Sequence, residues 1–136
     1  MRIFLDANIL FSAAKSNGAV RQFLVLLIDA GHECCADGYV VEEARRNLAI
    51  KAPEGLAVLD AFLAQMHVAA AHSDLETGEA TLAIADKDRP VLAAAIRLGC
   101  DVLLTGDRTH FGAFYGKRLG GVTIHSPRSL AAALLS

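Results

Sequence analysis

Four acidic residues are the strongest candidates for chemistry in this chain: Asp6, Glu43, Asp88 and Asp107. Asp6 directly follows the apolar run at residues 3–5, and Asp107 follows a second apolar run at residues 102–104. A carboxylate at the end of a buried strand lies at the carboxyl edge of a parallel sheet, where ligands bind in open α/β folds. Taken alone, Asp6 is also explained as a helix-capping residue at a strand-to-helix turn.

Several carboxylates that converge on one sheet edge repel one another, which raises their pKa values and destabilises the protein. A hard divalent cation relieves this repulsion. Since we expect no Cys or His among the ligands, the oxygen-only site favours Mg²⁺ or Mn²⁺ and argues against Zn²⁺. The chemistry that such a site supports is metal-assisted hydrolysis of a phosphodiester.

The elements that must position these acids alternate between strands and helices. Short apolar runs predict strands at residues 3–5, 33–36, 67–71, 102–105 and 122–124. Helical spacing and capping signals predict helices at residues 9–15, 20–30, 39–50, 53–66, 88–98 and 127–135, with a helical turn at 111–115. Residues 73–87 are polar and give no clear pattern. The alternation predicts an α/β fold with a mostly parallel sheet covered on both faces.

Composition limits the remaining possibilities. The 136 residues form a single expected domain, 1–136, in which 54% hydrophobic content favours a packed core over disorder. The apolar runs are too short to cross a membrane. Three cysteines without metal-type spacing are expected to be buried, reduced thiols of a cytoplasmic protein. The net charge of −2 means that any contact with nucleic acid must come from a local basic patch.

Three segments, in order, carry a resemblance to a known family: RIFLDANILFSA, VVEEARRNL and DRPVLAAAIRLGCDVLLTGDRTHFG. The sequence resembles the PIN domain, the small metal-dependent nuclease domain of VapC-type toxins, from Arg2 to the final helix. The resemblance implies a three-layer α/β/α sandwich. It also identifies Asp6 with the first metal-binding acid of the family, Asp107 with the acid of its T-G-D segment, and Asp88 with the acid before the penultimate long helix.

The helical acid of the family corresponds to Glu43 better than to Glu42, because Glu43 lies six residues after the turn residue Asp37. The resemblance also implies supporting residues. Asn8 is expected to hold Asp6 or a water, and Thr105 to support the site through its hydroxyl, while Ala7 stands where the family usually has Thr.

Asp86 is either an auxiliary ligand or an unrelated acid near the match.

Substrate contacts are less specific. Arg45 and Arg46 follow Glu43 on one helix, and Arg108 and His110 follow Asp107, so both pairs are candidates for holding phosphates. A solvated helix face explains them equally well. His110 could also transfer a proton, because imidazole titrates near neutral pH.

The resemblance implies a Mg²⁺- or Mn²⁺-dependent endoribonuclease that cleaves single-stranded RNA. It further implies a homodimer and, often, a small antitoxin that covers the active groove, as in a type II toxin–antitoxin pair. Two alternatives stay open: a housekeeping RNA-processing nuclease, and a catalytically silent PIN-like module that binds RNA or protein. A phosphatase of the haloacid-dehalogenase type fits poorly, because Asn8 stands where that class has a second Asp.

Overall fold

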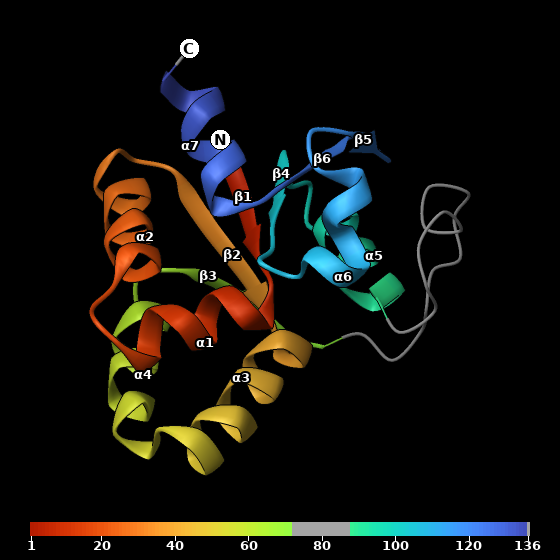
Figure 1. The fold of residues 1–136 in the computed structure, drawn as a ribbon. Helices are drawn as coiled ribbons and strands as arrows, with labels where there is room; N and C mark the ends of the chain where they lie inside the picture. Colours follow the sequence, from red (N-terminus) through yellow and green to blue (C-terminus); the bar gives the residue numbers. More distant parts are fainter. Residues whose placement is uncertain (72–87, 136) are drawn as a thin grey trace.

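A six-stranded sheet, ordered β3-β2-β1-β4-β6-β5, forms the centre of the protein in a computed structural model that describes residues 1–71 and 88–135 (Figure 1). All neighbouring strands are parallel except β5 and β6. The strands are β1 Arg2–Leu5, β2 Glu33–Asp37, β3 His67–Ala69, β4 Val102–Leu104, β5 Arg118–Leu119 and β6 Val122–His125.

The central strands are short because they are apolar on both faces and end where a polar residue appears. Ile3, Phe4 and Leu5 of β1 are fully buried, as is Leu103 of β4. The two strands pair in parallel, with Leu5 beside Leu104. Their carboxyl ends therefore meet at one edge of the sheet, and the residues that follow them are brought together there.

Helices cover both faces of this sheet, which gives the expected three-layer α/β/α arrangement (Figure 1). One group is α1 Ala7–Lys15, α2 Ala19–Asp29, α3 Gly38–Lys51 and α4 Leu56–Leu63; the other is α5 Arg89–Arg97 and α6 Arg108–Phe111. This division follows from right-handed crossovers, since the chain moves outward from β1 to β3 and then back across the sheet to β4. The last helix, α7 Pro127–Leu135, lines an apolar groove together with α2.

Several boundaries differ from the sequence expectation. Residues 53–55 form a 3₁₀ turn, and α4 ends at Leu63, so Met66 lies outside the helix. The expected turn at 111–115 begins earlier, because Asp107 caps α6 and starts it at Arg108. The strand β5 was not predicted, since a two-residue strand gives no detectable alternation. It pairs with β6 through a turn at Gly120 and Gly121, both with positive φ.

Other local expectations are confirmed. Gly31 adopts a φ of +88° just after α2, a conformation that favours glycine and ends the helix. The three cysteines are free and buried: Cys34, Cys35 and Cys100. Within the two described ranges, the helices are too short or too polar for any of them to traverse a lipid bilayer.

Candidate active site

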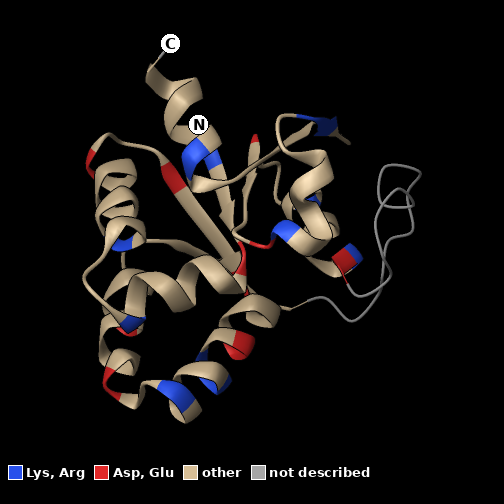
Figure 2. Ribbon diagram, in the orientation of Figure 1, with Lys and Arg blue, Asp and Glu red and all other residues tan. Residues whose placement is uncertain are grey.

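A pocket of about 210 Å³ opens at the carboxyl edge of the central strands. All four acids singled out in the sequence line it, together with one amide, two aromatic rings and one aliphatic side chain. The lining residues are Asp6, Asn8, Tyr39, Glu43, Asp88, Val91, Asp107 and His110. Figure 2 shows acidic segments, in red, close to the point where the central strands end and α6 begins. Among the described residues, no Lys or Arg lines the pocket.

Asp6 and Asp107 each cap a helix and also line the pocket. The Oδ1 atom of Asp6 accepts a 2.8 Å hydrogen bond from the backbone N–H of Ala7 at the start of α1. The Oδ1 atom of Asp107 accepts a 3.1 Å bond from the backbone N–H of His110 in α6. The capping interpretation and the functional one are therefore compatible, because each carboxylate uses one oxygen for its helix.

The second oxygen of Asp6 is held by two side chains. Thr105 Oγ1 donates to Asp6 Oδ2 at 2.8 Å, and Asn8 Nδ2 donates to the same atom at 3.1 Å. Asp6 is only 6% exposed, and this burial raises the pKa of its carboxyl group. The hydrogen bonds from Thr105, Ala7 and Asn8 act in the opposite direction, while the nearby charge of Glu43 adds to the rise.

Thr105 and Asn8 connect the two β-to-α turns. The backbone N–H of Asp107 donates to Thr105 Oγ1 at 3.2 Å, and Asn8 Nδ2 donates to that same hydroxyl at 3.3 Å. The backbone N–H of Gly106 donates to Asn8 Oδ1 at 2.7 Å. These bonds place both residues between Asp6 and Asp107, where a hydroxyl and an amide can fix the positions of the two carboxylates.

The two adjacent glutamates of α3 point in different directions. Glu43 lines the pocket, whereas the side chain of Glu42 is 74% exposed and lies 3.8 Å from Arg46. The start of α3 sets this rotation, because the buried Asp37 accepts a 3.2 Å bond from the backbone N–H of Val40 and caps the helix. The pocket therefore receives one acid from this helix.

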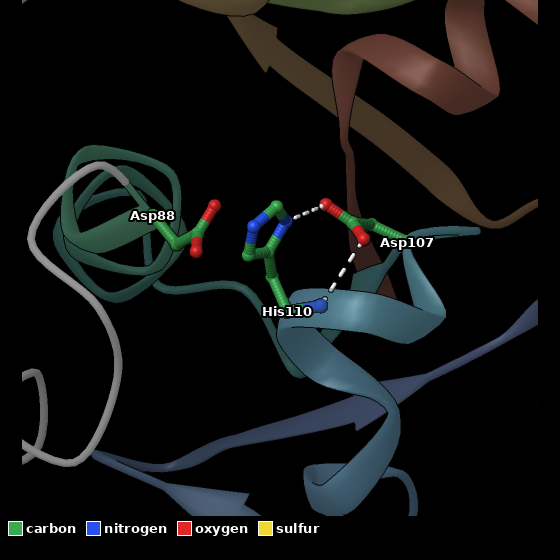
Figure 3. A group of neighbouring side chains, drawn as sticks. All are labelled: Asp88, Asp107 and His110. Carbon is green, nitrogen blue, oxygen red and sulfur yellow. Dashed lines mark hydrogen bonds and ion pairs between the residues drawn. The ribbon is translucent and has the colours of Figure 1, made fainter.

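Asp88, Asp107 and His110 form a compact group within the pocket lining (Figure 3). One potential ligand atom from each lies within 4.8 Å of the others. The imidazole Nδ1 of His110 bonds to Asp107 Oδ2. Burial alone would raise the pKa of Asp107, but the bonds from His110 outweigh it and hold that pKa below its usual range.

The structure places His110 among the acids, whereas the sequence analysis expected no Cys or His near them. His110 lies among the acids because Asp107 caps a single helical turn, and the side chain three residues later folds back over the cap. Imidazole nitrogen is a common zinc ligand, so the residues of this pocket do not exclude Zn²⁺.

Asp88 indicates that the pocket is suited to a cation. Its Oδ2 atom is buried and has no hydrogen-bond partner in the described part of the chain. A buried carboxylate oxygen without a donor is costly, unless a ligand or an ion completes its environment. Together with three further pocket carboxylates, this oxygen fits a positively charged ligand.

The other predicted site residues lie outside the pocket lining. Arg45 Nη2 forms an ion pair with Asp60 Oδ1 of α4 at 2.7 Å, and Arg46 lies near Glu42. Arg108 is exposed at the start of α6. Asp86 falls outside the described residues.

Two pocket residues, Tyr39 and Val91, were missed by the sequence analysis. Helical spacing could have found both, because Tyr39 precedes Glu43 by four residues on α3 and Val91 follows Asp88 by three. Burial raises the pKa of Tyr39, and the charges of Glu43, Asp6 and Asp88 add to this effect.

Comparisons with solved structures show the same fold. VapBC2 from Rickettsia felis bound to a DNA fragment from its promoter aligns at a TM-score of 0.66 with 18% identity, over 93% of this chain and 98% of that chain. The DNA-bound VapBC of Salmonella typhimurium also aligns at a TM-score of 0.66, with 17% identity. The alignment covers 93% of this chain and 98% of that chain.

Mycobacterium tuberculosis VapC20, a toxin that cleaves the sarcin-ricin loop, aligns at a TM-score of 0.60 with 16% identity, over 82% of this chain and 94% of that chain. At these identities the likenesses show the fold. A search of curated protein sequences gives no significant match. The family model for the PIN domain matches residues 2–109. The chain therefore belongs to the PIN domain family.

Proposed function

We propose that this protein is an endoribonuclease that uses Mg²⁺ or Mn²⁺ to hydrolyse phosphodiester bonds of single-stranded RNA. The observation that carries the proposal is the convergence of four carboxylates on one pocket, with no Lys or Arg in its described lining. A metal-free pocket of this kind concentrates negative charge, so a divalent cation is the ligand that it favours.

In this proposal Asp6, Glu43, Asp88 and Asp107 hold the cation. A divalent cation in the pocket supplies Lewis-acid activation of water and stabilises the charge that develops on the phosphate. Binding of the cation would also compensate the buried Asp88 Oδ2, which has no hydrogen-bond donor among the described residues. Asp6 contributes the Oδ2 atom that faces Thr105 and Asn8, and it keeps Oδ1 on the α1 cap.

Thr105 and Asn8 act as positioning residues. Their hydrogen bonds fix Asp6 relative to the turn that carries Asp107, so the carboxylates need little rearrangement when a cation enters. Such preorganisation is a general source of catalytic power, because it removes the cost of ordering the charged groups during the reaction. Arg108, exposed beside the pocket at the start of α6, is the candidate for contacting substrate phosphate.

The choice of RNA, and of a toxin role, is supported by the family and by the structural relatives. Two of the relatives are VapBC complexes, and VapC20 cleaves the sarcin-ricin loop. We propose by analogy that this chain is the toxin of a type II toxin–antitoxin pair, a homodimer acting in the cytoplasm, whose small antitoxin covers the pocket. A housekeeping nuclease without an antitoxin is the alternative, and a small gene directly upstream would distinguish the two.

A catalytically silent binding module is the second alternative. The four pocket acids argue against it, because a module without chemistry has no reason to keep so many carboxylates close together. Proteins that bind RNA without cleaving it present cationic and aromatic groups to the strand. The described lining of this pocket instead holds four carboxylates and no Lys or Arg.

The experiment that tests the proposal is cleavage of a mixed set of structured and single-stranded RNAs in Mg²⁺, in Mn²⁺ and in EDTA. We expect cleavage that requires the cation and is lost in Asp6→Asn and in Asp107→Asn, with circular dichroism confirming that both variants fold. Cleavage that persists in EDTA or in either variant would contradict the site assignment. The same RNAs tested beside matching DNA strands determine the substrate class.

A further inference from the structure

We infer that His110 supplies a nitrogen ligand to the cation, which makes the site favour Mn²⁺ over Mg²⁺. The inference rests on the proposed cation site. It begins from the position of the imidazole, which lies between the carboxyl groups of Asp88 and Asp107 in Figure 3. A side chain in this position either takes part in binding the cation or must move away when the cation enters.

The distances favour participation. Atoms that bind one cation lie about 2.0–2.3 Å from it, so two ligands of the same ion are at most about 4.6 Å apart. The potential ligand atoms of Asp88, Asp107 and His110 already lie within 4.8 Å of one another. After a small side-chain adjustment, Asp88 and the second ring nitrogen of His110 could share a single ion, while Asp107 fixes the ring through its bond to Nδ1.

The hydrogen bonding of the ring supports the same conclusion. A histidine that binds a metal usually bonds through its other ring nitrogen to a carboxylate or carbonyl, which fixes the ring. Here Nδ1 of His110 bonds to Asp107, and the second ring nitrogen lies on the Asp88 side of the ring (Figure 3). That side also presents the buried Asp88 Oδ2, which has no hydrogen-bond partner among the described residues.

A nitrogen donor changes the order of preference among cations. Mg²⁺ favours oxygen ligands and keeps several waters, whereas imidazole binds first-row transition metals more strongly than it binds Mg²⁺. A pocket with His110 among its ligands should therefore discriminate between Mn²⁺ and Mg²⁺ more than a carboxylate-only pocket does.

Pulsed electron paramagnetic resonance of the full chain loaded with Mn²⁺ tests this inference directly, because it detects nitrogen bound to the ion. We expect a ¹⁴N coupling in the wild type that disappears in His110→Gln. The control is His67→Gln, which removes an exposed histidine of β3 and should leave the coupling unchanged. Calorimetric titration should show that His110→Gln weakens Mn²⁺ binding by at least about tenfold, because losing an outer-shell partner of a metal ligand already costs about tenfold to a hundredfold. Binding of Mg²⁺ should change much less.

Absence of ¹⁴N coupling in the Mn²⁺-loaded wild type, or its persistence in His110→Gln, would overturn the inference. If RNA cleavage still required a cation and Asp6 in that case, the proposed function would stand and only the nitrogen ligand would be wrong. If the wild type bound neither Mn²⁺ nor Mg²⁺, both the inference and the proposed function would fail.

Discussion

The hydroxyl of Thr105 donates a 2.8 Å hydrogen bond to Asp6 Oδ2 and so joins two turns that are 99 residues apart in the sequence. The same hydroxyl accepts the backbone N–H of Asp107 at 3.2 Å. One buried side chain thus sets the position of one acid directly and of another through its backbone. This relationship explains how two separate β-to-α turns form a single site.

Replacing Thr105 with Val keeps the shape of the side chain but removes the hydroxyl. The buried Asp6 Oδ2 then loses a donor and the Asp107 N–H loses its acceptor, which should lower the free energy of unfolding by about 1–3 kcal/mol. Denaturant unfolding measures this change. Thr105→Ser retains the hydroxyl and should lie close to the wild type in stability and cleavage. A larger loss in Thr105→Ser than in Thr105→Val would mean that the methyl group, not the hydroxyl, is what matters.

Asp6 and Asp107 should give opposite pH dependences of stability in the metal-free protein. The pKa of Asp6 is raised in the folded state, mainly by burial, so the ionised carboxylate destabilises the folded protein. This destabilisation decreases as the pH falls through the raised pKa of the folded state. It is absent below the ordinary pKa of about 3.9. The pKa of Asp107 is lowered in the folded state, because the bonds from His110 outweigh the effect of burial. The ionised carboxylate of Asp107 therefore stabilises the folded protein above a pH of about 3.9, and this stabilisation is lost as the pH falls through the lowered pKa.

The measurement is unfolding of wild type, Asp6→Asn and Asp107→Asn in chelator at a series of pH values. As the pH falls, the free energy of unfolding of the wild type should rise relative to that of Asp6→Asn. Over the same fall in pH, the free energy of unfolding of the wild type should drop relative to that of Asp107→Asn. Slopes of the same sign would contradict the environments assigned to these two carboxylates.

A divalent cation that binds only the folded protein should raise its melting temperature. The expected gain is about 2.7 kcal/mol when the free cation is about a hundredfold above its Kd. Melting in Mn²⁺ and in EDTA measures the gain for wild type and for Asp107→Asn. The variant should show a much smaller increase, because it lacks one pocket carboxylate. An equal increase in both proteins would place the bound cation elsewhere.

Arg108→Gln should weaken RNA binding, because the exposed side chain lies directly after the pocket acid Asp107. Loss of one phosphate contact to a single strand should reduce the slope of log K against log salt by about 0.7. Binding is measured in the Asp6→Asn background, so that the RNA stays intact. The matched control is Arg128→Gln, which removes an exposed arginine of α7 and should leave the slope unchanged. Equal effects in both variants would remove Arg108 from the substrate site.

The fold and the convergence of the acids could be predicted from sequence because the strands carrying them are short apolar runs ended by a charge. Residues 3–5 and 102–104 are buried on both faces, and the polar residue after each run must lie at the sheet edge. Glu43 was identified through the family resemblance, from its position six residues after Asp37, the residue that caps α3.

The position of His110 could not be predicted in the same way. His110 is brought back over Asp107 because it lies three residues later on a single helical turn. A helix of four residues leaves no periodic pattern in the sequence. The arginines show a different limit, since only a three-dimensional structure reveals that Arg45 is paired with Asp60 on another helix.

The most direct test of the account compares Glu43→Gln with Glu42→Gln in Mn²⁺-dependent cleavage of single-stranded RNA. The two substitutions are chemically identical and adjacent in sequence, but only Glu43 lines the pocket, while Glu42 is exposed beside Arg46. We predict that Glu43→Gln loses most of the cleavage and that Glu42→Gln retains it, while both variants remain folded in EDTA. Retained cleavage in Glu43→Gln, or equal loss in both variants, would contradict the claim that this pocket is the catalytic site.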